Sequence, residues 1–305
     1  MRLLQSVGFL PNSRMNAMRF EKLALIGCGL IGGSFALALK KAGCVQHVSG
    51  TSASLASCEA ALSLGVIDEI ANSSQAAVAG ADLVLIAVPV FSIETVLADI
   101  APHLSPQALV MDVGSSKSMV AEKAKSALGD QYPSFVPAHP IAGKEQHGVR
   151  HAEASLFENH KTILTPTLET RPELITLAKS VWEITGSKVS IMSPAEHDQA
   201  LAAISHLPHL IAFAAVNALH SQPQRELFLD MAGPGFRDFS RIAASSPEVW
   251  LDIFLSNKED LLSQLQAFKV ALSTFEEGLL SDDSASITQL IDQASQVRKH
   301  WRLNG

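Results

Sequence analysis

Short, nearly continuous apolar runs recur through the first two thirds of the chain, and stretches of helical periodicity separate them. Runs of this kind are typical of strands that are buried on both faces of a parallel sheet. The pattern predicts strands over residues 20–26, 45–50, 81–88, 108–113 and 134–138, and helices over 34–40 and 55–64. Strands that alternate with helices predict an α/β fold with a doubly wound parallel sheet.

The pattern changes near Ser193, where strand signals nearly vanish. Helical periodicity continues over residues 194–220, 246–280 and 284–302. We therefore predict a leader without folding signals over 1–18, a Rossmann-like domain over 19–192 and an all-α domain over 193–305. The helix at 194–220 carries an apolar stripe wider than one core face needs, as expected at a helical dimer interface. Burial of this helix within its own domain explains the stripe equally well.

The composition excludes several classes of protein. Hydrophobic residues make up 47% of the chain and charged residues 17%, which is incompatible with intrinsic disorder. A net charge of −7 argues against binding to nucleic acid, because that binding depends on basic surface. We expect no membrane span, because no apolar run of about 20 residues is free of charge. The three cysteines form no CxxC pair and no disulfide framework, which indicates reduced thiols. Reduced thiols predict a cytoplasmic protein.

The sequence Gly27-Cys28-Gly29-Leu30-Ile31-Gly32 follows the first predicted strand and opens the first predicted helix. In this context a GxGxxG pattern predicts a dinucleotide site. Gly27 allows the tight turn, Gly29 lets the backbone approach a pyrophosphate, and Gly32 lets helix and strand pack closely. The helix N-terminus, with Leu30 and Ile31, supplies N–H groups and positive potential to the phosphates. Nothing else suggests a flavin, so we expect NAD(P).

The end of the second predicted strand bears on the choice between NAD and NADP. An NAD site usually offers an acid there, but the sequence is Thr51-Ser52-Ala53-Ser54. Without an acid, the hydroxyls of Thr51, Ser52 and Ser54 can bond a 2′-phosphate, although no arginine stands nearby. The expectation leans to NADP or to the use of both cofactors. Val88 and Pro89, at the end of a later strand, complete the expected cofactor-binding residues.

Four polar segments carry candidate chemistry: DVGSSK at 112–117, HPIAGKE at 139–145, EHD at 196–198 followed by SHLPH at 205–209, and GFRDFSRIA at 235–243. Together with the glycine-rich loop, these segments resemble the prephenate/arogenate dehydrogenase family of tyrosine biosynthesis, in the same order and over about residues 20–260. The resemblance implies an NAD(P)-dependent oxidative decarboxylation. Prephenate would give 4-hydroxyphenylpyruvate, and arogenate would give tyrosine.

The resemblance also implies catalytic roles. His139 corresponds to the family's catalytic histidine, which suits a base that takes a hydroxyl proton while hydride leaves. Ser115 corresponds to the serine that bonds this histidine and the nicotinamide end of the cofactor, although the neighbouring Ser116 could be the true partner. A histidine that merely caps a strand end is the alternative for His139.

A dianionic substrate needs positive groups, and the resemblance assigns substrate binding to residues of the helical domain. Arg241 matches the family's carboxylate-binding arginine, and a surface pair with Asp238 is its alternative. His209 matches the substrate-binding histidine, and His206 lies one turn before it. Either ring could instead be a buried core histidine. Pro208 removes an N–H between them and frees a carbonyl near Ile204, which predicts a kink.

Three further residues have open roles. Glu145 matches a family glutamate that gates the site through ionic contacts, whereas Lys144 replaces a small residue of the family pattern. Asp198 could orient the region of His209, or could be a solvated acid at a helix start. The H-x-x-H pair could bind a metal, but a metal site needs a third ligand, and His197 lies nine residues before His206, roughly across the helix, so we expect no metal.

Two other functions compete with this interpretation. A related hydroxyacid or imine oxidoreductase would more naturally use a catalytic lysine on the helical domain, where this chain has histidines and Arg241. A redox-sensing module that binds NAD(P) without turnover would not need His139, Ser115 and Arg241 together. We therefore expect an enzyme with a small-molecule substrate, acting as a homodimer through its helical domain.

Overall fold

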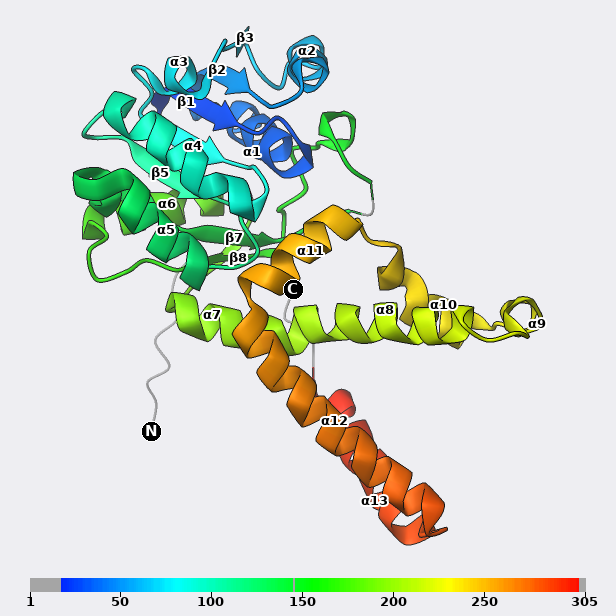
Figure 1. Cartoon of the computed structure of the whole chain (residues 1–305). Coiled ribbons are helices and arrows are strands. Elements are labelled where there is room, and N and C mark those ends of the chain that lie inside the picture. The colour runs from blue at the N-terminus through cyan, green and yellow to red at the C-terminus, as the bar shows by residue number, and fades with distance from the viewer. Residues whose placement is uncertain (1–17, 145, 302–305) are drawn as a thin grey trace, which may run out of the picture. The chain divides into compact units, whose positions relative to one another are not determined.

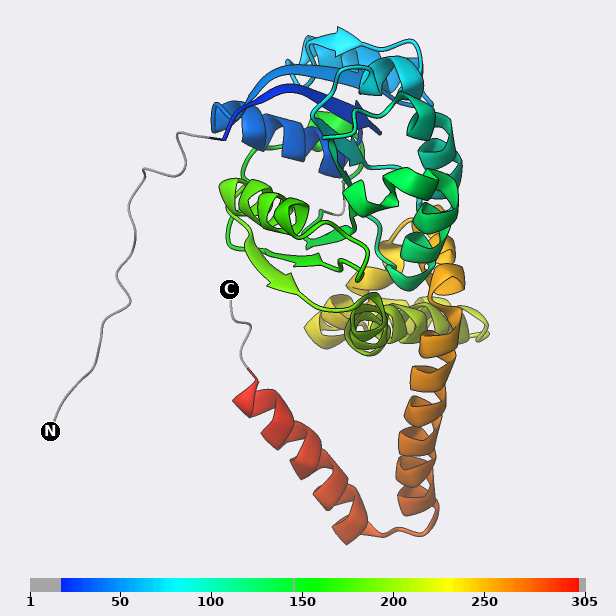
Figure 2. The same cartoon turned by 90° about the vertical axis from the view of Figure 1, so that its left-hand side faces the viewer.

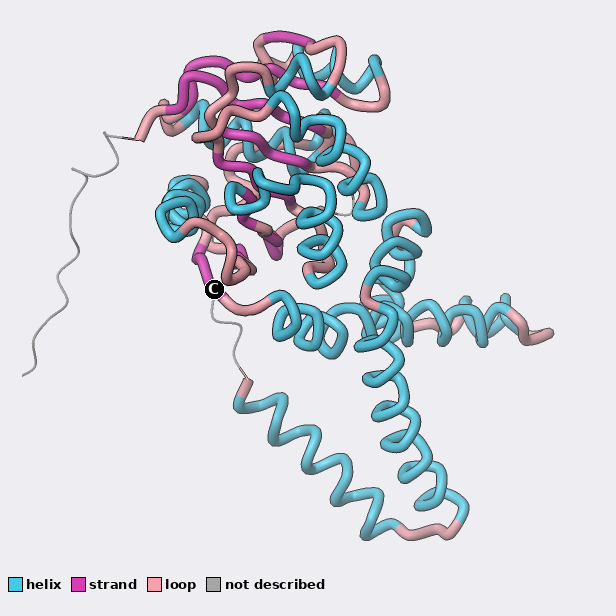
Figure 3. The backbone as a smooth tube through the Cα atoms, turned by 60° about the vertical axis from the view of Figure 1, so that its left-hand side comes forward, coloured by secondary structure: helices cyan, strands magenta, loops and turns pink. Residues whose placement is uncertain are grey.

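The computed structural model describes residues 18–144 and 146–301, and the chain divides into two compact units. The first unit comprises 18–88, 92–114 and 123–191, and the second comprises 89–91, 115–122 and 192–301. Strands are confined to the first unit, and the second is helical (Figure 3). The predicted leader lies outside the described residues except for Met18, and so does Glu145.

The first unit is built on a six-stranded sheet of order β3-β2-β1-β4-β5-β6, in which every pairing is parallel. Its strands are β1 (Phe20–Ile26), β2 (Val45–Thr51), β3 (Glu69–Ile70), β4 (Leu83–Ile86), β5 (Leu109–Asp112) and β6 (Phe135–Val136). The central strands β4 and β5 are buried at every position, as their continuous apolar runs predict. This order is that of a dinucleotide-binding Rossmann fold, which confirms the predicted fold class.

Helices cover both faces of this sheet (Figures 1 and 2). They are α1 (Leu30–Lys41), α2 (Leu55–Ser63), α3 (Ser74–Val78), α4 (Ile93–Ile100), α5 (Ser118–Leu128), which belongs to this unit from residue 123 on, and α6 (Pro172–Ile184). Figure 2 shows α1 and α6 on one side of the sheet and α4 on the other. The core between α1 and α6 contains fully buried aromatic rings, with Phe35 and Phe157 at 4.9 and 5.3 Å from Trp182.

The strand predicted over 134–138 is two strands. β6 ends at Val136, and β7 (Ala138–Ile141) belongs to a second sheet of order β7-β8-β9, with β8 (Lys161–Leu164) and β9 (Lys188–Ile191). Pro137 separates them, because a proline has no N–H to continue a ladder. This break carries the chain from the main sheet to the strand that holds His139.

The second unit begins with a long helix that is interrupted by one π-helical turn. α7 (Pro194–Leu201) starts at a capping box between Ser193 and Glu196. The π-turn Ala202–His206 follows, and then α8 (Leu207–His220). The ring of Pro208 would clash with the carbonyl of Ile204 in a regular helix, and the wider turn relieves that clash. The predicted kink therefore takes the form of a π-turn.

The remaining helices of this unit follow α8. They are α9 (Arg225–Asp230), α10 (Pro234–Ser240), the short 3₁₀ helix η7 (Arg241–Ala244), α11 (Pro247–Ser256), α12 (Lys258–Leu280) and α13 (Ser284–His300). The helical stretch predicted over 246–280 is broken at Asn257, which has φ −121° and ψ 38°. Figure 2 shows α12 and α13 diverging from their connecting turn.

Large apolar side chains of this unit are exposed, among them Ile204 at 74%, Met231 at 78% and Leu280 at 81%. In the described part of the chain, one helical stretch, Pro194–His220, is long and apolar enough to meet a criterion for crossing a membrane. The mean hydropathy of its apolar window is 1.4, and 22% of that window is buried. One such stretch is a weak indication, because core helices of soluble proteins pass the same test.

Candidate functional site

The turn after β1 has a backbone that only glycine accommodates. Gly27 has φ +103°, and a Cβ there would lie 2.2 Å from the carbonyl oxygen of Ala87. A Cβ on Gly32 would lie 2.4 Å from the carbonyl oxygen of Gly27. Backbone bonds hold this turn to both neighbouring strands, since the Gly27 amide donates to Thr51 and the Ala87 amide to Ile26. The close packing of β1, α1 and β4 therefore depends on these two glycines.

Gly29 differs from them, because a Cβ there would meet no atom within 4 Å. It precedes α1, whose N-terminus has no side-chain cap and no acid in its first turn. Leu30 and Ile31 begin this helix and are half-buried. An open backbone approach together with uncapped N–H groups fits the pyrophosphate of a dinucleotide.

The end of β2 carries hydroxyls at the position where the sequence predicts the adenosine ribose. Thr51 and Ser52 are half-buried there, and no acid lies between residues 51 and 54. The hydroxyl of Ser54 caps α2 by accepting from the amide of Ser57. Val88, half-buried, follows β4, whose carboxyl end is next to that of β1 in the sheet. Pro89 is exposed and belongs to the second unit.

His139 lies on β7, half-buried and in register with Ile163 of β8. The fully buried carboxylate of Asp112 fixes the start of this strand. Its Oδ1 accepts from the amide of Ala138 at 3.3 Å, and its Oδ2 from that of Gly114 at 2.8 Å. Asp112 thus ties the end of β5 to the strand of His139, a role that its place in the DVGSSK motif did not reveal.

Lys144, whose role the sequence leaves open, forms an ion pair with Glu153 at 2.7 Å. The amide of Glu153 in turn donates to the hydroxyl of Ser34 on α1. Glu145 lies outside the described residues, so its gating role stays a prediction.

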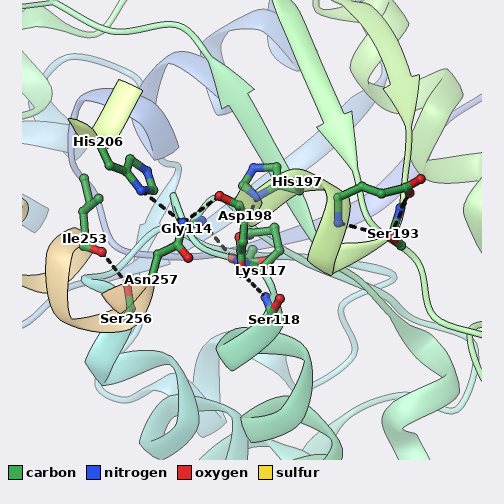
Figure 4. Close-up of polar contacts among 12 residues, drawn as sticks. Gly114, Lys117, Ser118, Ser193, His197, Asp198, His206, Ile253, Ser256 and Asn257 are labelled. Atoms are coloured by element: carbon green, nitrogen blue, oxygen red, sulfur yellow. Dashed lines mark hydrogen bonds and ion pairs between the residues drawn. The ribbon is translucent and has the colours of Figure 1, made fainter. Parts of the chain in front are cut away.

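Ser115 and Ser116 belong to the second unit, in the segment that leads into α5. Ser115 is half-buried, whereas Ser116 is fully buried and its hydroxyl has no hydrogen-bond partner. The next two backbone amides donate to Asp198, from Lys117 to Oδ1 at 2.8 Å and from Ser118 to Oδ2 at 2.7 Å (Figure 4). Asp198 therefore caps α5 and holds the segment that carries both serines.

Asp198 is 1% exposed and also accepts from Nδ1 of His197 at 2.7 Å. Burial alone would raise the pKa of this carboxyl, but the bonds from His197, Ser118 and Lys117 outweigh burial and lower it. Its burial contradicts the solvated acid, and its side-chain bonds hold the Lys117–Ser118 segment and His197, so the proposed orientation of the His209 region stays a prediction. The buried His197 is the hydrogen-bond partner of Asp198.

His206 is 1% exposed, and its Nδ1 accepts from the side-chain amide of Asn257 at 3.1 Å (Figure 4). Burial lowers the pKa of His206 to about 4, and the nearby Asp198 opposes this shift. The ring is therefore neutral at pH 7. Its substrate-binding role stays a prediction, and its burial matches the core-histidine alternative.

His209 is half-buried, and its ring stacks on Trp250 with centroids 3.6 Å apart. Its Nδ1 donates to the carbonyl of Ser205 at 2.9 Å. Burial lowers the pKa of His209, the bond to Ser205 opposes this, and the positive charge of Arg241 lowers it further. Arg241 begins η7, which packs against α8, the helix of His209, as a shared substrate site would require. Trp250 carried no signal in the sequence beyond its apolar character.

Arg241 begins η7 and is exposed. Asp238, the partner considered for it from sequence, forms an ion pair with Arg237 at 3.2 Å. Among the described residues no group of three or more metal-ligating side chains is positioned to hold an ion. The structure thus groups the cofactor-loop residues and His139 within one unit, and Ser115, His206, His209 and Arg241 within the other.

Both units match models of one family. The nucleotide-binding domain of prephenate dehydrogenase matches residues 35–191, and the dimerization domain of prephenate dehydrogenase matches residues 193–293. Together the two matches cover most of the chain.

Individual relatives agree with these models. The prephenate dehydrogenase of Bacillus subtilis is 36% identical, over 93% of this chain and 76% of its own. The cyclohexadienyl dehydrogenase of Zymomonas mobilis is 35% identical, over 92% of this chain and 95% of its own length. A crystal structure of prephenate dehydrogenase from A. aeolicus, in complex with hydroxyphenyl propionate and NAD+, superposes with a TM-score of 0.86 at 34% identity, covering 93% of this chain and 99% of that one. The chain therefore belongs to the prephenate dehydrogenase family and is an NAD-dependent oxidoreductase.

Proposed function

We propose that the protein oxidises prephenate to 4-hydroxyphenylpyruvate and CO2. The observation that carries this proposal is the match of both domains to prephenate dehydrogenase models, over a chain with a glycine-rich loop fit for a dinucleotide. The residues that the sequence predicts for the site supply a base, a carboxylate-binding cation and hydrogen-bonding groups.

In this reaction His139 accepts the proton of the ring hydroxyl while hydride leaves the same carbon. The bound nicotinamide supplies the hydride acceptor. The ring carboxylate then leaves as CO2, and its bonding electron pair makes the ring aromatic. The proton held by His139 returns to the resulting phenolate. The roles of His139 and of Ser115 are supported by Asp112, which fixes the strand of His139, and by Asp198, which holds the Ser115 segment.

Arogenate is the second substrate that we propose. Relatives include a cyclohexadienyl dehydrogenase, and a crystal structure of arogenate dehydrogenase from Synechocystis superposes with a TM-score of 0.79 at 32% identity, covering 91% of this chain and 99% of that one. Steady-state rates with prephenate and arogenate, each with NAD+ and NADP+, test these choices. Turnover of prephenate is expected with at least one of the two cofactors. Turnover of arogenate alone would reverse the assignment.

NADP+ is the cofactor that the end of β2 favours. No carboxylate there repels a 2′-phosphate, and the hydroxyls of Thr51 and Ser52 can bond it. A Kd for NADP+ equal to or below that for NAD+ would support this preference. The matched variant Ser52→Asp places an acid at this strand end, and we expect it to weaken NADP+ binding at least tenfold and leave NAD+ binding within about threefold.

A homodimer accounts for the exposed apolar side chains of the helical unit. Leu227, Leu229, Met231, Leu272 and Leu280 are all more than half exposed there, and the unit matches a domain named for dimerization. A second copy would cover this surface, including the apolar stretch Pro194–His220. Light scattering at micromolar concentration should give twice the chain mass, and a monomer mass would refute the proposal.

A further inference from the structure

The side-chain amide of Asn257 connects two segments of the helical unit. Asn257 is 5% exposed and lies at the break between α11 and α12. Its Nδ2 donates to the backbone carbonyl of Asp198 at 2.8 Å and to Nδ1 of His206 at 3.1 Å (Figure 4). An amide nitrogen has two hydrogens, so both are used.

This contact determines where His206 carries its proton. An Nδ1 that accepts a hydrogen bond is unprotonated, so the neutral ring has its hydrogen on Nε2. The charged or titratable groups that act on the ring are Asp198 and His197 on α7 and His209 on α8. Burial and the two neighbouring histidines outweigh the charge of Asp198 and keep the ring neutral at pH 7. Nε2 of His206 is therefore a hydrogen-bond donor.

His209 has the opposite arrangement. A backbone carbonyl only accepts, so the bond from Nδ1 to Ser205 fixes the proton of His209 on Nδ1. When this ring is neutral, its Nε2 is an acceptor. Both rings contact Trp250, with centroid distances of 6.3 Å for His206 and 3.6 Å for His209. His206 at the end of the π-turn and His209 in the first turn of α8 thus offer one donor and one acceptor.

Asn257 also acts on the serine segment. Asn257 donates to the backbone carbonyl of Asp198. The side chain of Asp198 in turn holds the backbone amides of Lys117 and Ser118. The same amide group therefore braces His206 and the residue that positions Ser115.

We propose that Asn257 is a positioning residue that locks His206 as the Nε2–H tautomer, so that His206 donates a hydrogen bond to the substrate. The second half rests on the proposed function together with the substrate-binding role that the sequence predicts for His206. The first half concerns the free protein and stands without it.

Nitrogen-15 NMR of the imidazole rings in the full chain tests the tautomer directly. The wild type should show His206 with a protonated Nε2 and an unprotonated Nδ1 between pH 6 and 8. In Asn257→Leu, which has nearly the same shape and no donors, Nδ1 loses its partner and His206 should become a mixture of tautomers. A wild-type ring protonated on Nδ1, or an unchanged spectrum in this variant, would overturn the proposal.

Asn257→Asp gives a readout that a purely structural role would not produce. A carboxylate accepts from Nδ1, so the pKa of His206 should rise from about 4 toward neutrality. Below that new pKa the imidazolium still carries Nε2–H, and KM for prephenate should be close to that of the wild type. Above it the neutral ring keeps its proton on Nδ1, the donor is lost, and KM should rise about tenfold. A flat KM profile in this variant would contradict the proposal.

The control is Gln266→Leu, which removes an exposed amide from α12. It should leave KM and the His206 spectrum unchanged, and Kd for NAD+ should be retained in all three variants. If the wild type shows the Nε2–H tautomer but no turnover of prephenate, the proposed function fails while the tautomer lock stands. If the wild type turns over prephenate but His206 is protonated on Nδ1, the tautomer proposal fails and the proposed function stands.

Discussion

Asp198→Asn should loosen the cap of α5 and lower both stability and turnover. The carboxylate accepts two backbone amides, at 2.8 and 2.7 Å, and Nδ1 of His197. An asparagine keeps one acceptor oxygen, and its NH2 group would face the amide of Ser118 donor to donor. Hydrogen bonds to charged groups are worth about 1.5–3 kcal/mol each. Losing one, and weakening the others, should cost about 2–3 kcal/mol.

The assay is urea unfolding followed by far-UV circular dichroism, together with steady-state kinetics. Stability at pH 7 should fall by about 2–3 kcal/mol. Because Ser115 precedes the capped amides, kcat should drop about tenfold or more, while Kd for NAD+ is retained. The carboxyl has a lowered pKa when folded, so its contribution is present above the unfolded pKa of about 4 and disappears as pH falls through the folded pKa. The variant should lack this part of the acid sensitivity.

Glu196→Gln is the matched control. Glu196 lies two residues earlier on the same helix, in an exposed capping box, and glutamine still offers an oxygen to the amide of Ser193. Its effects on stability and kcat should be much smaller than those of Asp198→Asn. If Asp198→Asn is as stable and as active as the control, the carboxylate does not hold the serine segment.

Four further predictions concern the two units separately. Gly27→Ala should raise the Kd for NAD+ more than tenfold in titrations, because φ is +103° there and the added Cβ would overlap the Ala87 carbonyl. The control Gly43→Ala, at φ +68° with open space around the Cβ, should not raise this Kd. Equal effects of the two substitutions would refute a specific loop geometry. His139→Asn should lower kcat by orders of magnitude at unchanged Kd for NAD+, and a loss below about tenfold would place the base elsewhere. Arg241→Ala should mainly raise KM for prephenate, and a fall in kcat alone would contradict its binding role. His206 has a folded pKa of about 4, below its unfolded value of 6.5, so it should destabilise the protein by up to about 3 kcal/mol as pH falls from 6.5 to 4. The stability of His206→Asn, measured by urea unfolding, should therefore depend less on acid than that of the wild type. Equal dependence in the two proteins would refute the buried neutral ring.

Most of the α/β domain could be predicted from the sequence, because its signals are local. A continuous apolar run such as Leu83–Ile86 identifies a central parallel strand, and the glycine pattern after Phe20–Ile26 identifies the cofactor loop. The family and the fold class inferred from these motifs are confirmed by the comparisons. The boundary at Pro137 was missed, although a proline inside a predicted strand is a local warning of a break.

The parts of the site that escaped prediction depend on contacts between distant segments. Asp112 reaches Ala138, Asp198 reaches Lys117, and Asn257 reaches His206, across 26, 81 and 51 positions. Periodicity carries no information about such pairs. The only local signal for Asn257 was an asparagine inside a long stretch of predicted helix, where it is a poor helix former. Its partner could not have been read from the sequence.

The stoichiometry of a complete reaction tests the assigned activity most directly. Purified protein with limiting prephenate and excess NAD+ or NADP+ should release one NAD(P)H, one CO2 and one 4-hydroxyphenylpyruvate for each prephenate consumed. Reduced cofactor without CO2 would contradict oxidative decarboxylation. No cofactor reduction with prephenate or arogenate would contradict the assigned reaction altogether.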